Sequence, residues 1–201
     1  MRRSHIWEGS SWHSTTFVQG KTDGRIRPLM DLTARIDNTR KDNTQMSNQR
    51  TILNAQGRSR YRSKIDLSDT YFLTRVEPEY QYPNCFKTPF GGLVSKVMLQ
   101  GDMNAPGKFI QIMSHQMRDY LGEFVWVYID DILIFSNQED EHMEHIKKVC
   151  RKLKEAHFFF SRKKSEFFSP NMNVLGYVVD DDGLHASAKR IGSHSEHPGA
   201  S

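Results

Sequence analysis

FVWVYIDDILIFS, residues Phe124 to Ser136, is the stretch that decides the fold of this chain. Two runs of β-branched and aromatic residues enclose Asp130 and Asp131, which predicts two short buried strands joined by a tight turn. Both carboxylates would lie at the tip, where mutual repulsion favours a bound cation, and Mg²⁺ prefers such hard oxygen ligands. Asp-Asp is also a common turn former, so the hairpin alone leaves a metal site and a plain turn equally open.

A third aspartate lies upstream, in the strand-like stretch YRSKIDLSDTYF from Tyr61 to Phe72. Asp66 is flanked there by apolar residues, and a buried carboxylate must be paired or bound to metal. Three carboxylates on adjoining strands form the kind of site that holds two divalent ions for phosphoryl or nucleotidyl transfer. The alternative is an ion pair between Asp66 and Lys64 or Arg62 at a strand end.

Four motifs follow one another in a specific order. They are Asp66-Leu67-Ser68-Asp69-Thr70-Tyr71, Leu99-Gln100-Gly101, Asn104-Ala105-Pro106 and Tyr128-Ile129-Asp130-Asp131. Together they resemble the reverse transcriptase of gypsy-class LTR retrotransposons, from about Thr16 to Ile191. The resemblance implies an α+β fold: a right-hand polymerase palm with an antiparallel sheet backed by helices, partial fingers and no thumb.

The resemblance also implies a division of the chain. Residues 1–63 would be partial fingers with a basic hairpin, 64–191 the palm with an interleaved fingers segment, and 192–201 a disordered tail. The implied activity is RNA-directed DNA polymerisation, in which two Mg²⁺ ions, or Mn²⁺ as a substitute, support transfer of a deoxynucleotide to a primer 3′-hydroxyl. The thumb, RNase H and integrase parts of the polyprotein would be absent. A catalytically silent nucleic-acid-binding remnant, or a purely structural product, therefore remains the alternative.

The same resemblance assigns roles to individual residues. Asp66, Asp130 and Asp131 match the catalytic metal-binding carboxylates, and the backbone carbonyl of Leu67 would add a ligand. The residues matched to nucleotide binding are Lys21, Arg27, Tyr71, Gln100, Gly101 and Lys164, and those matched to primer–template contact are Tyr128, Leu175, Gly176 and Tyr177. The implied partners are an RNA or DNA template, a DNA or tRNA-like primer and deoxynucleoside triphosphates.

Several of these roles have a simpler alternative. Tyr71 would select deoxyribose because a 2′-hydroxyl would collide with its ring, but ordinary strand packing also suits it. Lys164, in a basic run, would help to protonate the leaving pyrophosphate, while a solvent-facing charge is as good an explanation. The basic segment Gly20–Leu29 predicts an Asp-Gly hairpin that binds triphosphate, or a solvated loop. Gln100 and Gly101 alone would mean a turn.

Two amphipathic helices are predicted, one from Pro106 to about Leu121 and one from Glu139 to about Ala156. The second would pack an apolar face formed by Met143, Ile146, Val149, Cys150 and Leu153. His142 and His145 could share a metal, but an exposed polar face explains them better. Asp180 to Asp182 are interpreted as a turn rather than a second acidic site.

Composition adds weaker indications. The 201 residues carry a net charge of +4, and Arg58, Arg60, Arg62 and Lys64 form a basic run that could bind a nucleic-acid backbone. The two cysteines lack metal-ligand spacing, which suggests a reduced, intracellular protein. No stretch is long enough for a membrane span, and no signal peptide is recognised. Thr33 to Ser63 has few apolar anchors and is expected to be loosely ordered.

Overall fold

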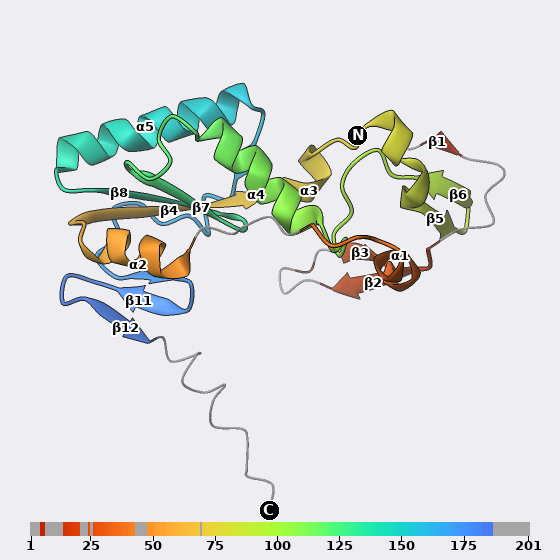
Figure 1. Cartoon of the computed structure of the whole chain (residues 1–201), viewed down its shortest axis with the longest axis horizontal. Helices are drawn as coiled ribbons and strands as arrows, with labels where there is room; N and C mark the ends of the chain where they lie inside the picture. The colour runs from red at the N-terminus through yellow and green to blue at the C-terminus, as the bar shows by residue number, and fades with distance from the viewer. Residues whose placement is uncertain are drawn as a thin grey trace, which may run out of the picture. The chain divides into compact units, whose positions relative to one another are not determined.

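A computed structural model describes residues 5–6, 14–20, 24, 26–42, 48–68 and 70–186. The chain divides into two compact units, residues 1–44 with 69–111 and residues 45–68 with 112–201. Figure 1 shows their elements, coloured along the chain. The predicted disordered tail, 192–201, lies outside the described residues. In the described part, no helix is both long and apolar enough to cross a membrane.

The first unit contains small sheets and short helices. Its strands are β1 (His5–Ile6), β2 (Thr16–Gly20), β3 (Ile26–Met30), β5 (Cys85–Thr88) and β6 (Gly91–Val94), and its short helices are α1 (Thr33–Asp37), α3 (Thr70–Leu73) and the 3₁₀ helices η1 (Pro78–Tyr80) and η2 (Tyr82–Asn84). The strand order β1-β6-β5 forms one sheet, and β2 pairs with β3. Gly20 lies opposite Ile26, so the hairpin predicted from the Asp-Gly signal is confirmed.

The second unit is built on a four-stranded antiparallel sheet in the order β7-β8-β4-β9. These strands are β7 (Val125–Tyr128), β8 (Asp131–Ser136), β4 (Tyr61–Ser68) and β9 (Phe159–Phe160). Helix α5 (Glu139–Glu155) covers one face, and Figure 1 shows α2 (Gln49–Gly57) with the outer strands on the other. The outer strands are β10 (Met172–Val174), β11 (Tyr177–Val179) and β12 (Leu184–Ala186). The predicted α+β class, with an antiparallel sheet backed by helices, is confirmed.

Alternation along the strands sorts the side chains between these two layers. Ser136 on β8 bonds to α5, so Ile132 and Ile134, at even spacing from it, face the same helix. Leu133 faces the opposite layer, where it packs in a cluster with side chains of α2 and the outer strands. The other buried members of this cluster are Ile52, Leu53, Met172, Val174 and Val179.

This cluster overturns the expectation that residues 33–63 are loosely ordered. Ile52 is completely buried and Leu53 nearly so, which anchors α2 to the second unit. These buried side chains hold the nine-residue helix against the second unit, although its overall composition is polar. The compact units divide the chain after residues 44, 68 and 111, and α2 belongs to the second unit.

Other boundaries also differ from the sequence expectation. The stretch expected to be strand up to Phe72 ends its strand at Ser68 and continues as the short helix α3. Helix α4 (Ala105–Gln116) ends before Leu121 because the chain there turns back toward β7, with Gly122 at φ +85°. Such a backbone conformation suits glycine and interrupts a helix.

The buried face of α5 is turned from the predicted one. Met143 is 44% exposed, whereas His142 and His145 are buried, so the expectation of an exposed polar face for the histidines is wrong. Ser136 Oγ lies 2.8 Å from Nδ1 of both rings, and Ser63 Oγ lies 2.8 Å from His142 Nε2. Buried hydroxyls thus provide the partners that allow imidazoles to occupy core positions.

One proton arrangement satisfies all of these contacts with both rings neutral. Ser63 accepts the Phe168 backbone N–H and donates to His142 Nε2, and His142 Nδ1–H then donates to Ser136. Ser136 donates in turn to His145 Nδ1, which leaves the His145 Nε2–H facing Glu141, 4.0 Å away. Burial, reinforced by His145, lowers the pKa of His142 to about 4, which is consistent with a neutral ring.

Ser136→Ala should lower the free energy of unfolding by about 1–3 kcal/mol, because it leaves two buried ring nitrogens without their shared partner. Urea denaturation at pH 7 would measure the change. Asn137→Ala, at the next, exposed position, is the matched control and should stay within about 0.5 kcal/mol of the original protein. Equal stability of the two variants would contradict the hydrogen-bond network.

Candidate active site

The tip of the β7–β8 hairpin is a two-residue loop, Ile129 and Asp130, because Tyr128 pairs directly with Asp131. Ile129 has φ +51°, a left-handed conformation that is strained for a β-branched residue. The carbonyl of Asp130 accepts a 3.0 Å hydrogen bond from the backbone N–H of Leu67. The loop is therefore tied to β4, the strand that carries the third aspartate.

Asp66 and Asp131 are direct cross-strand partners in the β4–β8 ladder. Directly opposite residues project to the same face of a sheet, so both carboxylates lie on the α2 side. The Asp66 backbone is fixed by the following segment, since its N–H donates to Ser165 Oγ at 3.1 Å and its carbonyl accepts from Ser161 N–H at 2.8 Å. The register thus brings two of the three predicted carboxylates together.

The ion pairs at this site differ from the alternative considered for Asp66. Lys164 Nζ lies 3.8 Å from Asp66 Oδ1, and the lysine side chain is 71% exposed. Lys64 lies 3.2 Å from Glu166 instead, and Arg62 lies 3.2 Å from Asp181. The sequence resemblance matches Lys164 to the nucleotide site, and the structure places its ammonium group beside Asp66. The assignment to nucleotide binding stays a prediction.

Electrostatic strain concentrates on Asp131. Burial raises the pKa of this carboxyl to about 6; Lys64 opposes the shift, and the nearby Asp66, Asp130 and Glu166 add to it. A carboxyl held among other carboxylates in a half-buried position is stabilised by a cation. The charge arrangement therefore fits a divalent metal ion at the tip of the hairpin.

The side chains of the described residues do not form a preorganised metal site. Among the described residues, no group of three or more His, Cys, Asp or Glu is arranged to hold a metal ion. The fit to metal rests on the backbone register of Asp66 with Asp131, the tie between Asp130 and Leu67, and the raised pKa of Asp131. Hard carboxylate and carbonyl oxygens are the ligand set that Mg²⁺ prefers.

Three of the residues matched to nucleotide binding are described in the first unit. Tyr71 lies in α3 rather than in a strand, with its ring centroid 6.0 Å from that of Phe109. Gly101 has φ +98° in the turn that follows Leu99, so the conformation favours glycine at this position. Gln100 precedes it in the same turn.

Two residues matched to triphosphate binding cannot be located fully. Lys21 lies outside the described residues. Arg27 lies on β3 opposite Gln19, and only its backbone is described. The assignment of both residues to triphosphate stays a prediction.

The residues matched to primer–template contact lie on the face of the sheet that α2 and the outer strands cover. Leu175 and Gly176 make the two-residue turn between β10 and β11, with φ of +55° and +79°. Leu175, Tyr177 and Tyr128 pack, partly buried, against the α2 cluster. The Tyr128 hydroxyl also accepts a 2.6 Å hydrogen bond from Gln49 Nε2. These side chains thus have a structural role whether or not they contact primer.

The basic run before Asp66 is not a continuous surface. Arg62 is only 2% exposed, and Lys64 is paired with Glu166. Strand alternation turns both side chains toward α2 and the outer strands, while Arg58 and Arg60 remain exposed. The expectation that all four cations could line a nucleic-acid backbone is therefore wrong for Arg62.

Sequence reasoning missed three residues that shape the site. They lie in the segment after β9. Ser161 and Ser165 form hydrogen bonds with the Asp66 backbone on β4, and Glu166 forms an ion pair with Lys64 of the same strand. Their only sequence signal is that polar residues interrupt the aromatic stretch between Phe160 and Phe167. Such a pattern indicates a turn but not which strand the turn contacts.

A family profile described as reverse transcriptase (RNA-dependent DNA polymerase) matches residues 18–179. The chain belongs to the reverse transcriptase family. This finding confirms the resemblance inferred from the four ordered motifs.

Similar reverse transcriptase sequences occur in retrotransposon polyproteins. The Pol polyprotein of transposon gypsy from Drosophila melanogaster is 26% identical over 195 residues, which cover 94% of this chain and 19% of the relative. That of transposon opus, from the same organism, is 29% identical over 142 residues, 71% of this chain and 14% of the relative. The Tf2-3 polyprotein of Schizosaccharomyces pombe is 32% identical over 129 residues, 64% of this chain and 10% of the relative. The chain thus spans less than a fifth of these relatives.

Solved structures agree with the fold. The foamy viral protease-reverse transcriptase in complex with RNA/DNA hybrid is 23% identical with a TM-score of 0.80, over 96% of this chain and 26% of that chain. The same protein in complex with dsDNA is 24% identical with a TM-score of 0.83, over 97% and 40%. The fold is therefore that of a polymerase palm fragment, with an antiparallel sheet backed by helices.

Without metal, Asp131→Asn should raise the free energy of unfolding at pH 7 by about 1–3 kcal/mol. The pKa of Asp131 is higher in the folded state than in the unfolded chain, so folding favours the protonated carboxyl and stability falls as the pH rises from about 4 past 6. The advantage of asparagine should therefore shrink toward pH 4. Chemical denaturation in EDTA across this range would measure it.

Asp119→Asn is the matched control for this experiment. A hydrogen bond from Lys152 lowers the pKa of Asp119, so removing its charge should not stabilise the protein. A pH-independent effect of Asp131→Asn would contradict the electrostatic strain at the hairpin.

Proposed function

We propose that this chain is the RNA-directed DNA polymerase core of a retrotransposon, which transfers deoxynucleotides to a primer 3′-hydroxyl. The observation that carries the proposal is the register of β4 with β8, which sets Asp66 opposite Asp131 beside the loop carbonyl of Asp130. Membership of the reverse transcriptase family supports it. The proposed partners are an RNA or DNA template, a DNA or tRNA-like primer and deoxynucleoside triphosphates.

Asp66, Asp130 and Asp131, with the carbonyl of Leu67, would hold two Mg²⁺ ions, for which Mn²⁺ would substitute. When bound, such ions supply charge neutralisation at the attacking and leaving oxygens. The hairpin would orient the carboxylates for this role, since backbone hydrogen bonds hold both the loop and β4. Binding requires ionised carboxylates, and a nearby dication favours the ionised form of Asp131 despite its raised pKa.

The remaining residues would act on the substrates. Lys164, mostly exposed beside Asp66, would donate a proton to the leaving pyrophosphate, and Lys21 and Arg27 would bind the triphosphate. Gln100 and Gly101 would contact the incoming nucleotide. Tyr128 and the Leu175-Gly176-Tyr177 turn would contact the primer–template. Their half-buried packing would give that contact surface a fixed shape.

Primer extension on an RNA template should require both hairpin carboxylates. We expect Asp130→Asn and Asp131→Asn to reduce incorporation by at least about 10³-fold, because each removes charge that the reaction must neutralise. Asp140→Asn, on the exposed start of α5, is the matched control and should retain the original rate. Incorporation would be followed with labelled primer in Mg²⁺ and then in Mn²⁺.

The outcomes separate the two functions considered for this chain. Loss in both hairpin variants, with primer–template affinity unchanged in a gel-shift assay, supports a polymerase. A folded original protein that binds template–primer but incorporates nothing with either metal would instead identify a silent nucleic-acid-binding remnant.

Tyr71→Ala should increase ribonucleotide incorporation relative to deoxynucleotide incorporation by about tenfold or more, corresponding to loss of a steric contact of about 1.4 kcal/mol. Tyr71→Phe keeps the ring and should preserve discrimination. The ratio of kcat/KM for the two sugars would measure the effect. Unchanged discrimination in Tyr71→Ala would leave Tyr71 with only its packing role against Phe109.

A further inference from the structure

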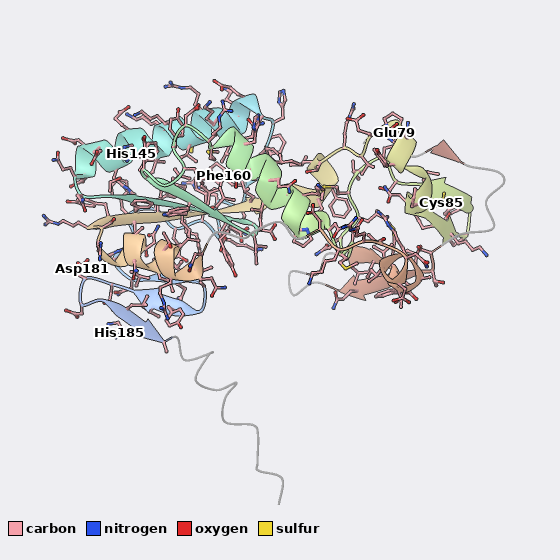
Figure 2. All side chains as sticks on the ribbon, in the orientation of Figure 1. Glu79, Cys85, His145, Phe160, Asp181 and His185 are labelled. Atoms are coloured by element: carbon pink, nitrogen blue, oxygen red, sulfur yellow. The ribbon has the colours of Figure 1, made fainter. Side chains whose placement is uncertain are left out.

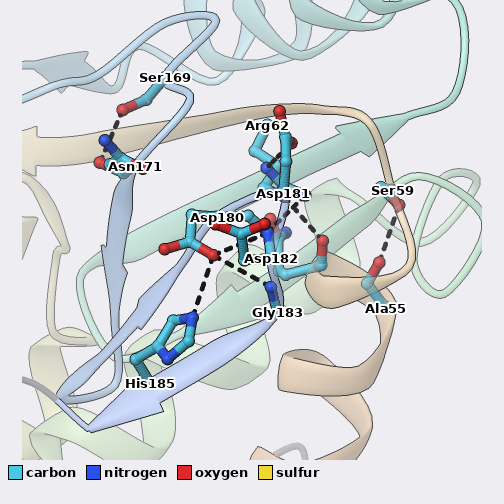
Figure 3. A network of polar contacts seen from close by, with 11 residues as sticks. Ala55, Ser59, Arg62, Ser169, Asn171, Asp180, Asp181, Asp182, Gly183 and His185 are labelled. Carbon is cyan, nitrogen blue, oxygen red and sulfur yellow. Dashed lines mark hydrogen bonds and ion pairs between the residues drawn. The ribbon is translucent and has the colours of Figure 1, made fainter.

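Arg62 is a buried cation in which each guanidinium nitrogen donates a hydrogen bond. It lies on β4 four residues before Asp66, and its side chain is only 2% exposed. Its guanidinium donates from Nε to Gln56 O at 2.9 Å, from Nη2 to Asp180 O at 3.1 Å and from Nη1 to Asp181 Oδ1 at 3.2 Å. Figure 3 shows Arg62 with these two aspartates of the β11–β12 turn.

These contacts explain why a charged group is tolerated here. Gln56 is in the last turn of α2, so its carbonyl belongs to the negative end of the helix. The planar fork of an arginine can serve separate acceptors at once, whereas a lysine ammonium is a single point of charge. Arg62 therefore joins its strand to two elements that β4 does not pair with: α2 and the turn between β11 and β12.

The turn that Arg62 contacts is closed by hydrogen bonds of its own. Asp180 Oδ1 accepts from the backbone N–H groups of Asp182 and Gly183, and His185 Nε2 lies 3.2 Å away. Figure 2 labels Asp181 and His185 in this layer beside α2. The three consecutive aspartates thus form a turn, as the sequence predicted, and one of them supplies the anion for the arginine.

Lys64, two residues further along β4, makes a parallel connection. Its Nζ donates to the backbone carbonyl of Asn173 on β10 at 3.2 Å. Alternate residues of β4 thus bind the outer strands first at Arg62 and then at Lys64, and the next residue on the same face is Asp66. The Leu175-Gly176-Tyr177 turn lies between the two strands so held.

We propose that Arg62 is a positioning residue, which ties the β10–β12 hairpins to the strand of Asp66 and thereby sets the distance between the primer-contacting turn and the catalytic carboxylates. This rests on the proposed polymerase function for its kinetic consequence. The mechanical part rests only on the three hydrogen bonds. Misplacement of a reacting group by about 1 Å can cost about 10²-fold in rate, so a loosened hairpin should be visible in kinetics.

The test is Arg62→Lys, which keeps the charge but loses the fork. Arg151→Lys, on the exposed face of α5, is the matched control. Amide hydrogen exchange of β11 and β12 measures the tie directly, without any need for activity. Single-nucleotide incorporation at saturating template–primer and nucleotide measures the maximal rate, and titrations of each give their apparent dissociation constants.

We expect Arg62→Lys to accelerate exchange in β11 and β12 at least tenfold while α5 stays protected. The maximal rate should fall about 10- to 100-fold, with both dissociation constants within about threefold of the original. In a variant that still folds, exchange accelerated as much in α5 as in β11 and β12 would overturn the proposal. So would exchange and rate that match the Arg151→Lys control.

If Arg62→Lys does not fold, Asp181→Ala decides the question, because Asp181 is 75% exposed and the change removes only the acceptor of Arg62 Nη1, leaving the other two hydrogen bonds intact. Faster exchange confined to β11 and β12 would then support the tie, and unchanged exchange would overturn it. If the original protein incorporates no nucleotide, the polymerase function fails separately, the kinetic role of Arg62 falls with it, and exchange alone decides the mechanical part.

Discussion

The antiparallel pairing of β4 with β8 is the constraint on which the rest of the second unit depends. One register sets Asp66 opposite Asp131, Lys64 opposite Leu133 and Arg62 opposite Phe135. A slip of one residue would exchange the two faces of β4, so Ser63 would leave the histidines of α5 and Arg62 would lose its acceptors. The buried polar contacts on both faces therefore stabilise the same alignment that pairs the carboxylates.

The two faces achieve this by different chemistry. Toward α5 the sheet presents a neutral network, in which Ser63 and Ser136 satisfy His142 and His145. Toward α2 it presents charges, each with a partner or a neighbour of opposite sign. Neutral hydrogen bonds can be buried completely, whereas the carboxylates lie nearer the open end of the strand, where a dication and substrate phosphates could reach them.

The β7–β8 hairpin and helix α5 were predictable from the sequence, because in both a strong local pattern coincides with burial in the fold. The β-branched runs around Asp130 have only one reasonable interpretation as a hairpin, and the acidic-to-basic gradient of α5 marks a helix with clear ends. Which face of α5 is buried was not predictable, because Met143 looks more apolar than His142, and Ser63, one of the two serines that accommodate the imidazoles, lies 79 positions before His142. The burial of Arg62 was missed for the same reason: its acceptors lie in α2 and in a turn near residue 180. Side-chain chemistry alone could not tell a paired, buried arginine from a solvated one.

The connections of Arg62 also have a consequence for the order of folding. Its two contacts in the β11–β12 turn join residues 118 and 119 positions apart in the chain. Contacts of such long sequence separation form late, because a large loop must close first. During synthesis, β4 and α2 emerge well before the turn that completes their charge arrangement. Until then Arg62 must stay solvated, so β4, the strand that carries Asp66, should reach its final position only after nearly the whole described chain has been made.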